Sequence, residues 1–271
     1  MNGASREALA AARERLDALT DSTSVDAVQL ADELAAVTAL LDREAGLRRV
    51  LTDPAQPGEA KAELVRRLIG GQVSGATVDL VSGLVRSRWS QPRDLVDALE
   101  ELANIADLTA AEKTDTLDDV EDELFRFGRI VSSSPDLRAA LTDRAVGPQA
   151  KAELVHRLLG GRAKPVTERL VTRLVIAPRG RSLEAGLESL SKLAAERRDR
   201  MVAVVTSAVP LSEGQKQRLG AALTKLYGRR MHLNLDVDPE VLGGVRVQVG
   251  DEVINGSLAD RLDEVARRMA S

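Results

Sequence analysis

The chain repeats itself at a shift of 90 residues, and this duplication limits the possible folds more than any other feature. Residues 60–71 read AKAELVRRLIGG and residues 150–161 read AKAELVHRLLGG, so the two segments differ at two of twelve positions. The same shift aligns the sequence DEL at residues 32–34 with DEL at residues 122–124. One shift that holds over such a length indicates a duplicated structural unit rather than a chance match.

Each copy has the apolar periodicity of α-helices. In the first copy, Leu64, Leu68 and Ile69 follow three-and-four spacing, and Gly70-Gly71 is a typical helix stop. An additional amphipathic helix is predicted over residues 5–19, ahead of the first copy. The second copy has no equally clear equivalent of it, and residues 109–120 either supply one or extend the helix before them.

The apolar period changes from helical to strand-like near residue 200. Residues 201–212 read as a strand followed by a proline turn, and Ser212 with Gln215 forms a capping box for the next helix. Alternating apolar residues predict a strand over 231–237, and the valines from Val245 onward predict a hairpin. A closing helix is predicted after the hairpin.

The predicted fold is therefore mainly α. It consists of two duplicated helical-bundle units followed by a small α/β domain with a β-hairpin and a C-terminal helix. The predicted domains are residues 1–110, residues 111–198 and residues 199–271.

Composition argues against several classes of function. The 271 residues include no cysteine and two histidines, His156 and His232, which leaves no plausible set of metal ligands. Aromatic residues make up 1% of the chain and the net charge is -4, so nucleic acid is not an expected partner. No apolar run approaches the roughly 18 to 20 residues of a spanning helix, and no secretory signal is recognisable. We therefore expect a cytoplasmic protein without direct membrane insertion.

No group of residues forms a credible catalytic or cofactor site. The pair Gly243-Gly244 leads into a strand and lacks the lysine and hydroxyl residue of a phosphate-binding loop. The duplicated Lys61 and Lys151 are interpreted as part of a solvated, charged helix face. Trp89 is interpreted as packing in the core or at an interface. The sequence predicts no catalytic residue, no cofactor and no metal.

The C-terminal stretch closely resembles the signature of the delta subunit of F-type ATP synthases, the family of the oligomycin-sensitivity-conferring protein. Residues 205–219, VTSAVPLSEGQKQRL, also resemble that family. Asn255 stands where the family commonly has aspartate, and the extra helical unit resembles enlarged actinobacterial members. The residues that carry the signature are Pro239, Gly243, Gly244, Val245, Val247, Gly250, Asp251, Ile254, Gly256, Ser257 and Arg261.

This resemblance implies a mechanical function. Members of the family form part of the peripheral stalk at the cytoplasmic face of the cell membrane, without an active site of their own. The implied partners are the N-terminal helices of the α subunits and the C-terminal helix of the b subunit. In the family, the groove for the α-subunit helix lies between the first and fifth helices. The corresponding lining residues here are Ala8, Leu9, Ala12, Leu16, Leu80 and Leu84.

Alternatives remain open at this level. The six groove residues are equally compatible with an internal core, and the second helical unit could hold the groove instead. A helical-repeat adaptor that regulates another cytoplasmic assembly would also explain the duplication. That reading leaves the match over residues 237–261 unexplained.

Overall fold

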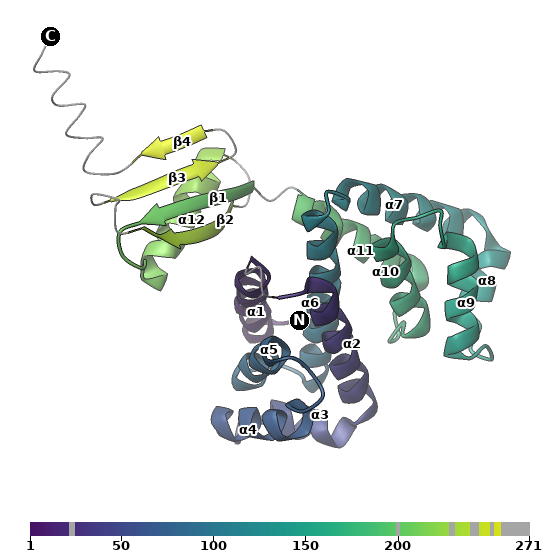
Figure 1. The fold of residues 1–271 in the computed structure, drawn as a ribbon. Helices are drawn as coiled ribbons and strands as arrows, with labels where there is room; N and C mark the ends of the chain where they lie inside the picture. Colours follow the sequence, from purple (N-terminus) through teal and green to yellow (C-terminus); the bar gives the residue numbers. More distant parts are fainter. Residues whose placement is uncertain (22–24, 199–200, 228–230, 239–243, 250–251, 256–271) are drawn as a thin grey trace, which may run out of the picture. The chain divides into compact units, whose positions relative to one another are not determined.

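The protein has two compact units in the computed structural model, Met1–Ala195 and Glu196–Ser271 (Figure 1). The residues described are 1–21, 25–198, 201–227, 231–238, 244–249 and 252–255. In the described part of the first unit, all regular structure is helical, as the duplicated apolar periodicity predicts.

The first repeat contains α1 (Gly3–Asp21), α2 (Ala27–Arg43), α3 (Ala45–Thr52), α4 (Gly58–Ile69), α5 (Gly75–Arg86) and α6 (Pro92–Lys113). The second contains α7 (Leu117–Ser133), α8 (Pro135–Thr142), α9 (Pro148–Leu159), α10 (Pro165–Ile176) and α11 (Leu183–Arg198). The bounds of α7 to α10 are those of α2 to α5 shifted by 90 residues. The duplication in sequence is therefore a duplication of helices.

Helix α6 belongs to both repeats. Its residues from Leu95 to Ala106 pack in the core of the first repeat, whereas Leu108 and Ala111 pack in the core of the second. The shift of 90 places α1 on residues 93–111, and α6 packs against α10 as α1 packs against α5. Helix α6 thus stands where the second repeat would need its own first helix, and residues 109–113 extend it. The boundary predicted at residues 110/111 lies inside this helix.

The glutamate of the DEL segment has the same hydrogen-bonding role in both repeats, which explains why the segment occurs twice. Glu33 accepts hydrogen bonds from the backbone N–H of Ser74 (3.0 Å) and from the Thr77 hydroxyl (2.5 Å), at the start of α5. Glu123 does the same at the start of α10, where the N–H of Lys164 (2.9 Å) and the hydroxyl of Thr167 (2.5 Å) donate to it. Each glutamate ties the second helix of its repeat to the N-terminus of the fifth, where a negative charge is favourable.

Replacing Glu33 with glutamine is expected to lower the free energy of unfolding by about 1–2 kcal/mol at pH 7, because a charged hydrogen-bond acceptor is lost. Burial raises the pKa of Glu33, but hydrogen bonds from Ser74, Thr77 and Gln29 outweigh it and the net pKa is lowered. A lowered pKa in the folded state means that the stabilisation is present above the unfolded pKa, about 4.3, and is lost as pH falls below it.

The measurement is urea unfolding at pH 6.5 and pH 3.5. Trp89 is the one tryptophan of the chain and is buried in the first repeat, so its fluorescence reports on the helical unit. Wild-type protein should lose more stability on acidification than Glu33→Gln. Equal losses in the two proteins would show that this carboxylate does not contribute in its charged form.

The repeated lysines are buried, contrary to their interpretation as part of a solvated face. Lys61 and Lys151 are 5% and 8% exposed, and the Lys61 ammonium donates to the Asp53 carbonyl at 3.4 Å. Burial lowers the pKa of Lys61 and the Asp53 carboxylate opposes that shift. The long aliphatic stem of a lysine can cover apolar surface. Helical periodicity alone does not show whether such a lysine is buried or exposed to solvent.

The second unit contains a four-stranded sheet of order β2-β1-β3-β4. Strand β1 pairs parallel with β2 and antiparallel with β3, and β3 pairs antiparallel with β4, which confirms the predicted hairpin. The elements are β1 (Met201–Ser207), α12 (Glu213–Tyr227), β2 (Met231–Val237), β3 (Val245–Val249) and β4 (Glu252–Asn255).

Side chains of the second unit match the sequence pattern in part. Ala203 and Val205 on β1 pack with Leu223 of α12. The capping box is formed, since the Ser212 N–H donates to the Gln215 side chain at 2.9 Å. Leu226, three residues after Leu223 on α12, is 66% exposed.

Most of the family signature lies outside the described residues. Gly244 is described, and its φ of 89° is a conformation that strongly favours glycine. Pro239, Gly243, Gly250, Asp251, Gly256, Ser257 and Arg261 are not among the described residues, nor is the predicted closing helix.

Candidate functional site

The seam between α1 and α5 contains the six residues predicted to line a helix-binding groove. All six are buried, with Ala8, Leu9 and Ala12 at 7–9% exposed and Leu16, Leu80 and Leu84 at 0–2%. They pack within the core of the first repeat. Their side chains therefore join α1 to the rest of the bundle, and a partner at this seam would meet the residues outside them.

The outer side of this seam is lined by small residues around one ion pair. Arg15 of α1 pairs with Asp79 of α5 across the seam, and both side chains are about half exposed. Gly83 follows Asp79 by one helical turn and is exposed, and a Cβ built on it meets no atom within 4 Å. Ala11, one turn before Arg15, is also exposed. Two small, exposed residues therefore lie beside this ion pair.

The equivalent seam of the second repeat, between α6 and α10, is filled by charged side chains. Asp107 is completely buried and accepts from Arg169 (2.9 Å) and Arg173 (2.7 Å). Arg173 also donates to the Asn104 side chain at 2.9 Å, and Arg169 reaches Asp32 of α2 at 2.6 Å. Burial raises the pKa of Asp107, and the two guanidinium groups oppose that shift. Burial of such a group is tolerated only because both guanidinium groups meet it.

A second cluster of charges closes the other end of this seam. Arg179, 3% exposed at its side chain, pairs with Asp97 and donates to the Val96 carbonyl at 3.1 Å. Arg181 pairs with Glu100 at 2.5 Å. The residues bound a hollow of about 280 Å³. Because these charges are paired with one another, the arrangement is typical of a structural network rather than of a catalytic site.

The arginines of this network are the residues that sequence reasoning missed. At the shift of 90, Arg169 replaces Asp79, Arg173 replaces Gly83 and Arg179 replaces Trp89. Trp89 is buried, as predicted, and its ring N–H donates to the Leu84 carbonyl at 2.8 Å. The second repeat has arginine at three positions where the first repeat has other residues. This difference is visible in the sequence and indicates that the two seams differ in chemistry.

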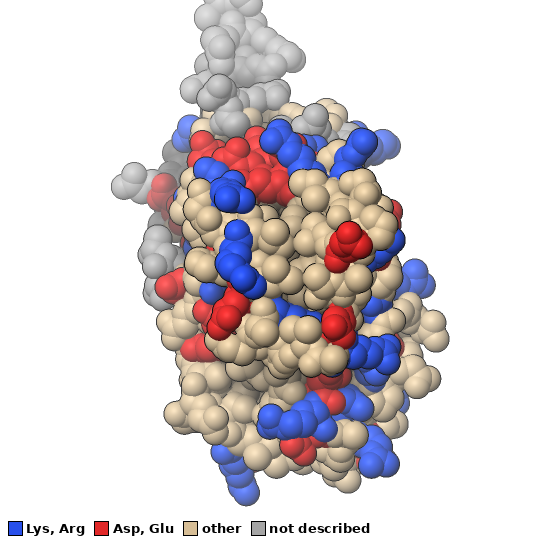
Figure 2. Space-filling model, turned by 90° about the vertical axis from the view of Figure 1, so that its right-hand side faces the viewer, with Lys and Arg blue, Asp and Glu red and all other residues tan. Residues whose placement is uncertain are grey.

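Outside the two seams, the described residues carry charges of both signs. On the face shown in Figure 2, Lys and Arg side chains are scattered among Asp and Glu side chains and a large uncharged area. Among the residues described, no group of three or more acidic, cysteine or histidine side chains is placed to hold a metal ion. No helix in the described ranges is long and apolar enough to cross a membrane. His156 is exposed and pairs with Glu168 at 2.7 Å.

Comparison with known proteins identifies the family of the chain. The family model described as ATP synthase delta (OSCP) subunit matches residues 105–269. The chain belongs to this family. The matched region begins inside α6 and covers the second repeat and the α/β unit, so the first repeat is the part that the family model does not cover.

Relatives of the same length show that the first repeat is shared by other members. A protein named ATP synthase subunit delta from Streptomyces avermitilis is 80% identical over 270 residues, covering 100% of this chain and 99% of the relative. One from Thermobifida fusca is 50% identical over 270 residues, covering 100% of both chains. A chain of the Toxoplasma gondii mitochondrial ATP synthase hexamer aligns with 62% of this chain and 95% of its own length at 24% identity. Its TM-score of 0.27 is too low to compare folds.

Proposed function

We propose that the chain is the delta subunit of an F-type ATP synthase and serves as a non-catalytic part of its peripheral stalk. In this role it links the catalytic head to the membrane sector and resists the torque of the turning central shaft. Family membership and full-length relatives named ATP synthase subunit delta support this proposal. The proposed site of action is the cytoplasmic face of the cell membrane.

The first repeat is proposed to dock an N-terminal helix of an α subunit at the outer seam between α1 and α5. The observation that carries this assignment is the contrast between Gly83, open to solvent, and its equivalent Arg173, which is bonded to Asn104 and Asp107. A helix can approach a surface of glycine and alanine closely. A seam already filled by guanidinium groups leaves less room for one.

The α/β unit is proposed to bind the C-terminal helix of the b subunit. Support comes from the family resemblance of residues 237–261 and from the match of the family model to residues 105–269. The two contacts together would place the chain between the head and the stalk helix, as a structural link requires.

The test is recovery of the chain from membranes of its source cell with an affinity tag. The tagged full-length protein is expected to bring down the α, β and b subunits, and the isolated protein is expected to have no ATPase activity. A tagged protein of similar charge and size from the same cell serves as the control for non-specific recovery.

Recovery of a different assembly, with no ATP synthase subunit above the level of the control, would contradict the proposed role in the peripheral stalk. The helical-repeat adaptor would then be the better explanation of the duplication. Turnover of a small molecule by the isolated chain would contradict both proposals.

A further inference from the structure

Two of the four asparagines of the chain, Asn2 and Asn255, are followed by glycine. Asparagine is one of the chemically labile side chains, because the backbone nitrogen of the next residue can displace its amide nitrogen as ammonia. Glycine in the next position favours this reaction, since its nitrogen is not crowded by a neighbouring Cβ. The sequence therefore contains two places with a high intrinsic tendency to lose ammonia, and the local structure decides how each of them behaves.

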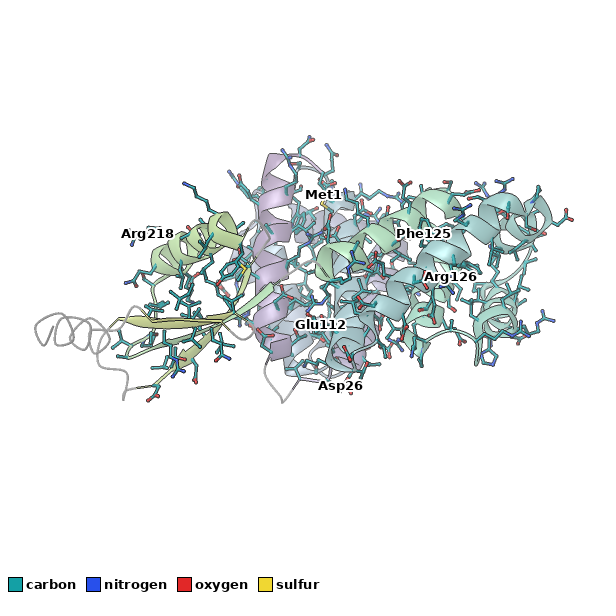
Figure 3. The ribbon with its side chains drawn as sticks, turned by 90° about the horizontal axis from the view of Figure 1, so that it is seen from above. Met1, Asp26, Glu112, Phe125, Arg126 and Arg218 are labelled. Carbon is teal, nitrogen blue, oxygen red and sulfur yellow. The ribbon has the colours of Figure 1, made fainter. Side chains whose placement is uncertain are left out.

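Asn2 lies outside regular structure, one residue before α1, and Asn2 and Gly3 are both exposed. Met1, labelled in Figure 3, is 44% exposed. Among the described residues, no hydrogen bond holds the side-chain amide of Asn2. The amide is therefore open to water and can turn toward the backbone that follows it.

The backbone nitrogen of Gly3 is the atom that can attack this amide. The first N–H groups of a helix have no partner within it, and the bond that opens α1 runs from the Arg6 N–H to the Asn2 carbonyl at 2.9 Å. The Gly3 N–H lies ahead of that bond. Attack requires the nitrogen to lose its proton, and the positive end of the helix dipole stabilises the resulting negative charge.

The conformational cost of the reaction is low at this place. Ring closure needs rotation about the Cα–C bond of Asn2, which breaks the hydrogen bond between Arg6 and Asn2 at a helix end, where opening costs little. The other asparagines are held more firmly. The Asn104 side chain, inside α6, accepts from Arg173 at 2.9 Å, and the remaining two lie in the paired strands β2 and β4.

We propose that Asn2 is a site of spontaneous deamidation and isomerisation through a succinimide. The Gly3 nitrogen loses its proton and bonds to Cγ of Asn2. The bond from Cγ to the side-chain nitrogen breaks, and this nitrogen leaves with the proton as ammonia. Solvent water then opens the five-membered ring. Cleavage between the Gly3 nitrogen and Cγ gives aspartate, whereas cleavage between that nitrogen and the backbone carbonyl carbon gives isoaspartate.

The two products have opposite effects on the start of α1. The first turn of this helix contains no acidic residue, so an aspartate at residue 2 adds a negative charge where the helix dipole favours one. Isoaspartate instead inserts a methylene group into the backbone, which disrupts the position from which the Asn2 carbonyl accepts the Arg6 N–H. At this exposed place the isoaspartate is also accessible to a methyltransferase that recognises isoaspartyl residues.

The test is incubation of the purified full chain at neutral pH, followed by peptide mass spectrometry. The probe for isoaspartate is an isoaspartyl methyltransferase with labelled S-adenosylmethionine. Residue 2 is expected to gain one dalton and to accept the labelled methyl group. The rate is expected to be within about tenfold of that in a synthetic peptide of residues 1–10, because a helix end opens at little cost. Asn104 serves as the internal reference and should keep its amide.

Gly3→Ala is the matched variant, because a Cβ at residue 3 meets no atom within 4 Å and alanine favours the helix. It is expected to slow the reaction at Asn2 about tenfold by crowding the attacking nitrogen. Asn2→Asp reproduces the aspartate product and should raise the midpoint of urea unfolding without accepting a methyl group. None of these measurements depends on the proposed function, which is tested by recovery of the ATP synthase subunits.

Retention of the amide at residue 2 while the peptide converts, or conversion slower than in the peptide by more than about tenfold, would show that the start of α1 protects Asn2 and would overturn the inference. A conversion rate unchanged by Gly3→Ala would overturn it as well, because the Gly3 nitrogen would then not be the attacking atom.

Discussion

Replacing Asp107 with alanine is expected to lower the free energy of unfolding of the helical unit by about 3–5 kcal/mol, because it leaves two guanidinium groups without their buried partner. Asp107 is completely buried between Arg169 and Arg173. The measurement is urea unfolding followed by Trp89 fluorescence, which reports on the repeat that shares α6.

The matched control is Asp32→Ala. Asp32 also pairs with Arg169, but its side chain is 58% exposed, so its loss is expected to cost at most about 1 kcal/mol. A second variant, Asp107→Leu with Arg173→Met, removes one buried charge pair together and is expected to recover part of the loss, because paired apolar replacements are often neutral.

Equal losses for Asp107→Ala and Asp32→Ala would show that the network does not hold the repeats together. A double variant no better than Asp107→Ala would mean that packing volume, rather than unpaired charge, sets the cost.

The helices of the repeats were predictable because local signals and burial agree there. Gly70 ends α4, and a Cβ on it would lie 2.4 Å from the Arg66 carbonyl oxygen, so glycine is required at that position. Gly160 has the same close approach, 2.5 Å, to the carbonyl of His156. The glycines and the DEL segment have the same structural role in both repeats. For this reason they recur in the sequence and could be recognised there.

The double role of α6 was not predictable from periodicity. Its apolar residues follow helical spacing throughout, and the sequence does not show that Leu102 and Leu108 pack in different cores. A chain cut after residue 110 would interrupt α6 near its end. Apolar side chains that α6 buries in each core would then be exposed. Point variants therefore separate the two repeats better than deletions do.

The candidate groove residues were selected by apolar spacing, and apolar spacing identifies a core as readily as a binding surface. Leu16 and Leu80, for example, are buried between helices. The positions that distinguish the two seams, Gly83 and Arg173, are ones that a search for apolar residues passes over.

Replacing Gly83 with arginine is expected to weaken docking of an α-subunit N-terminal helix strongly while leaving the fold intact. The substitution copies the second repeat, where Arg173 occupies the seam, and a Cβ at Gly83 meets no atom within 4 Å. Filling the seam is expected to weaken binding about a hundredfold, which corresponds to about 2.7 kcal/mol. The measurement is calorimetric titration of the full chain with a synthetic peptide of the α-subunit N-terminus.

The control is Gly46→Arg, because Gly46 is an exposed helical glycine of the same repeat whose Cβ also meets no atom within 4 Å. Both variants add the same side chain and one positive charge at an exposed glycine, so the comparison isolates the effect of position. If both bind the peptide as wild-type protein does, the outer seam of the first repeat is not the docking surface. If both lose binding equally, added charge rather than occupation of the seam is responsible.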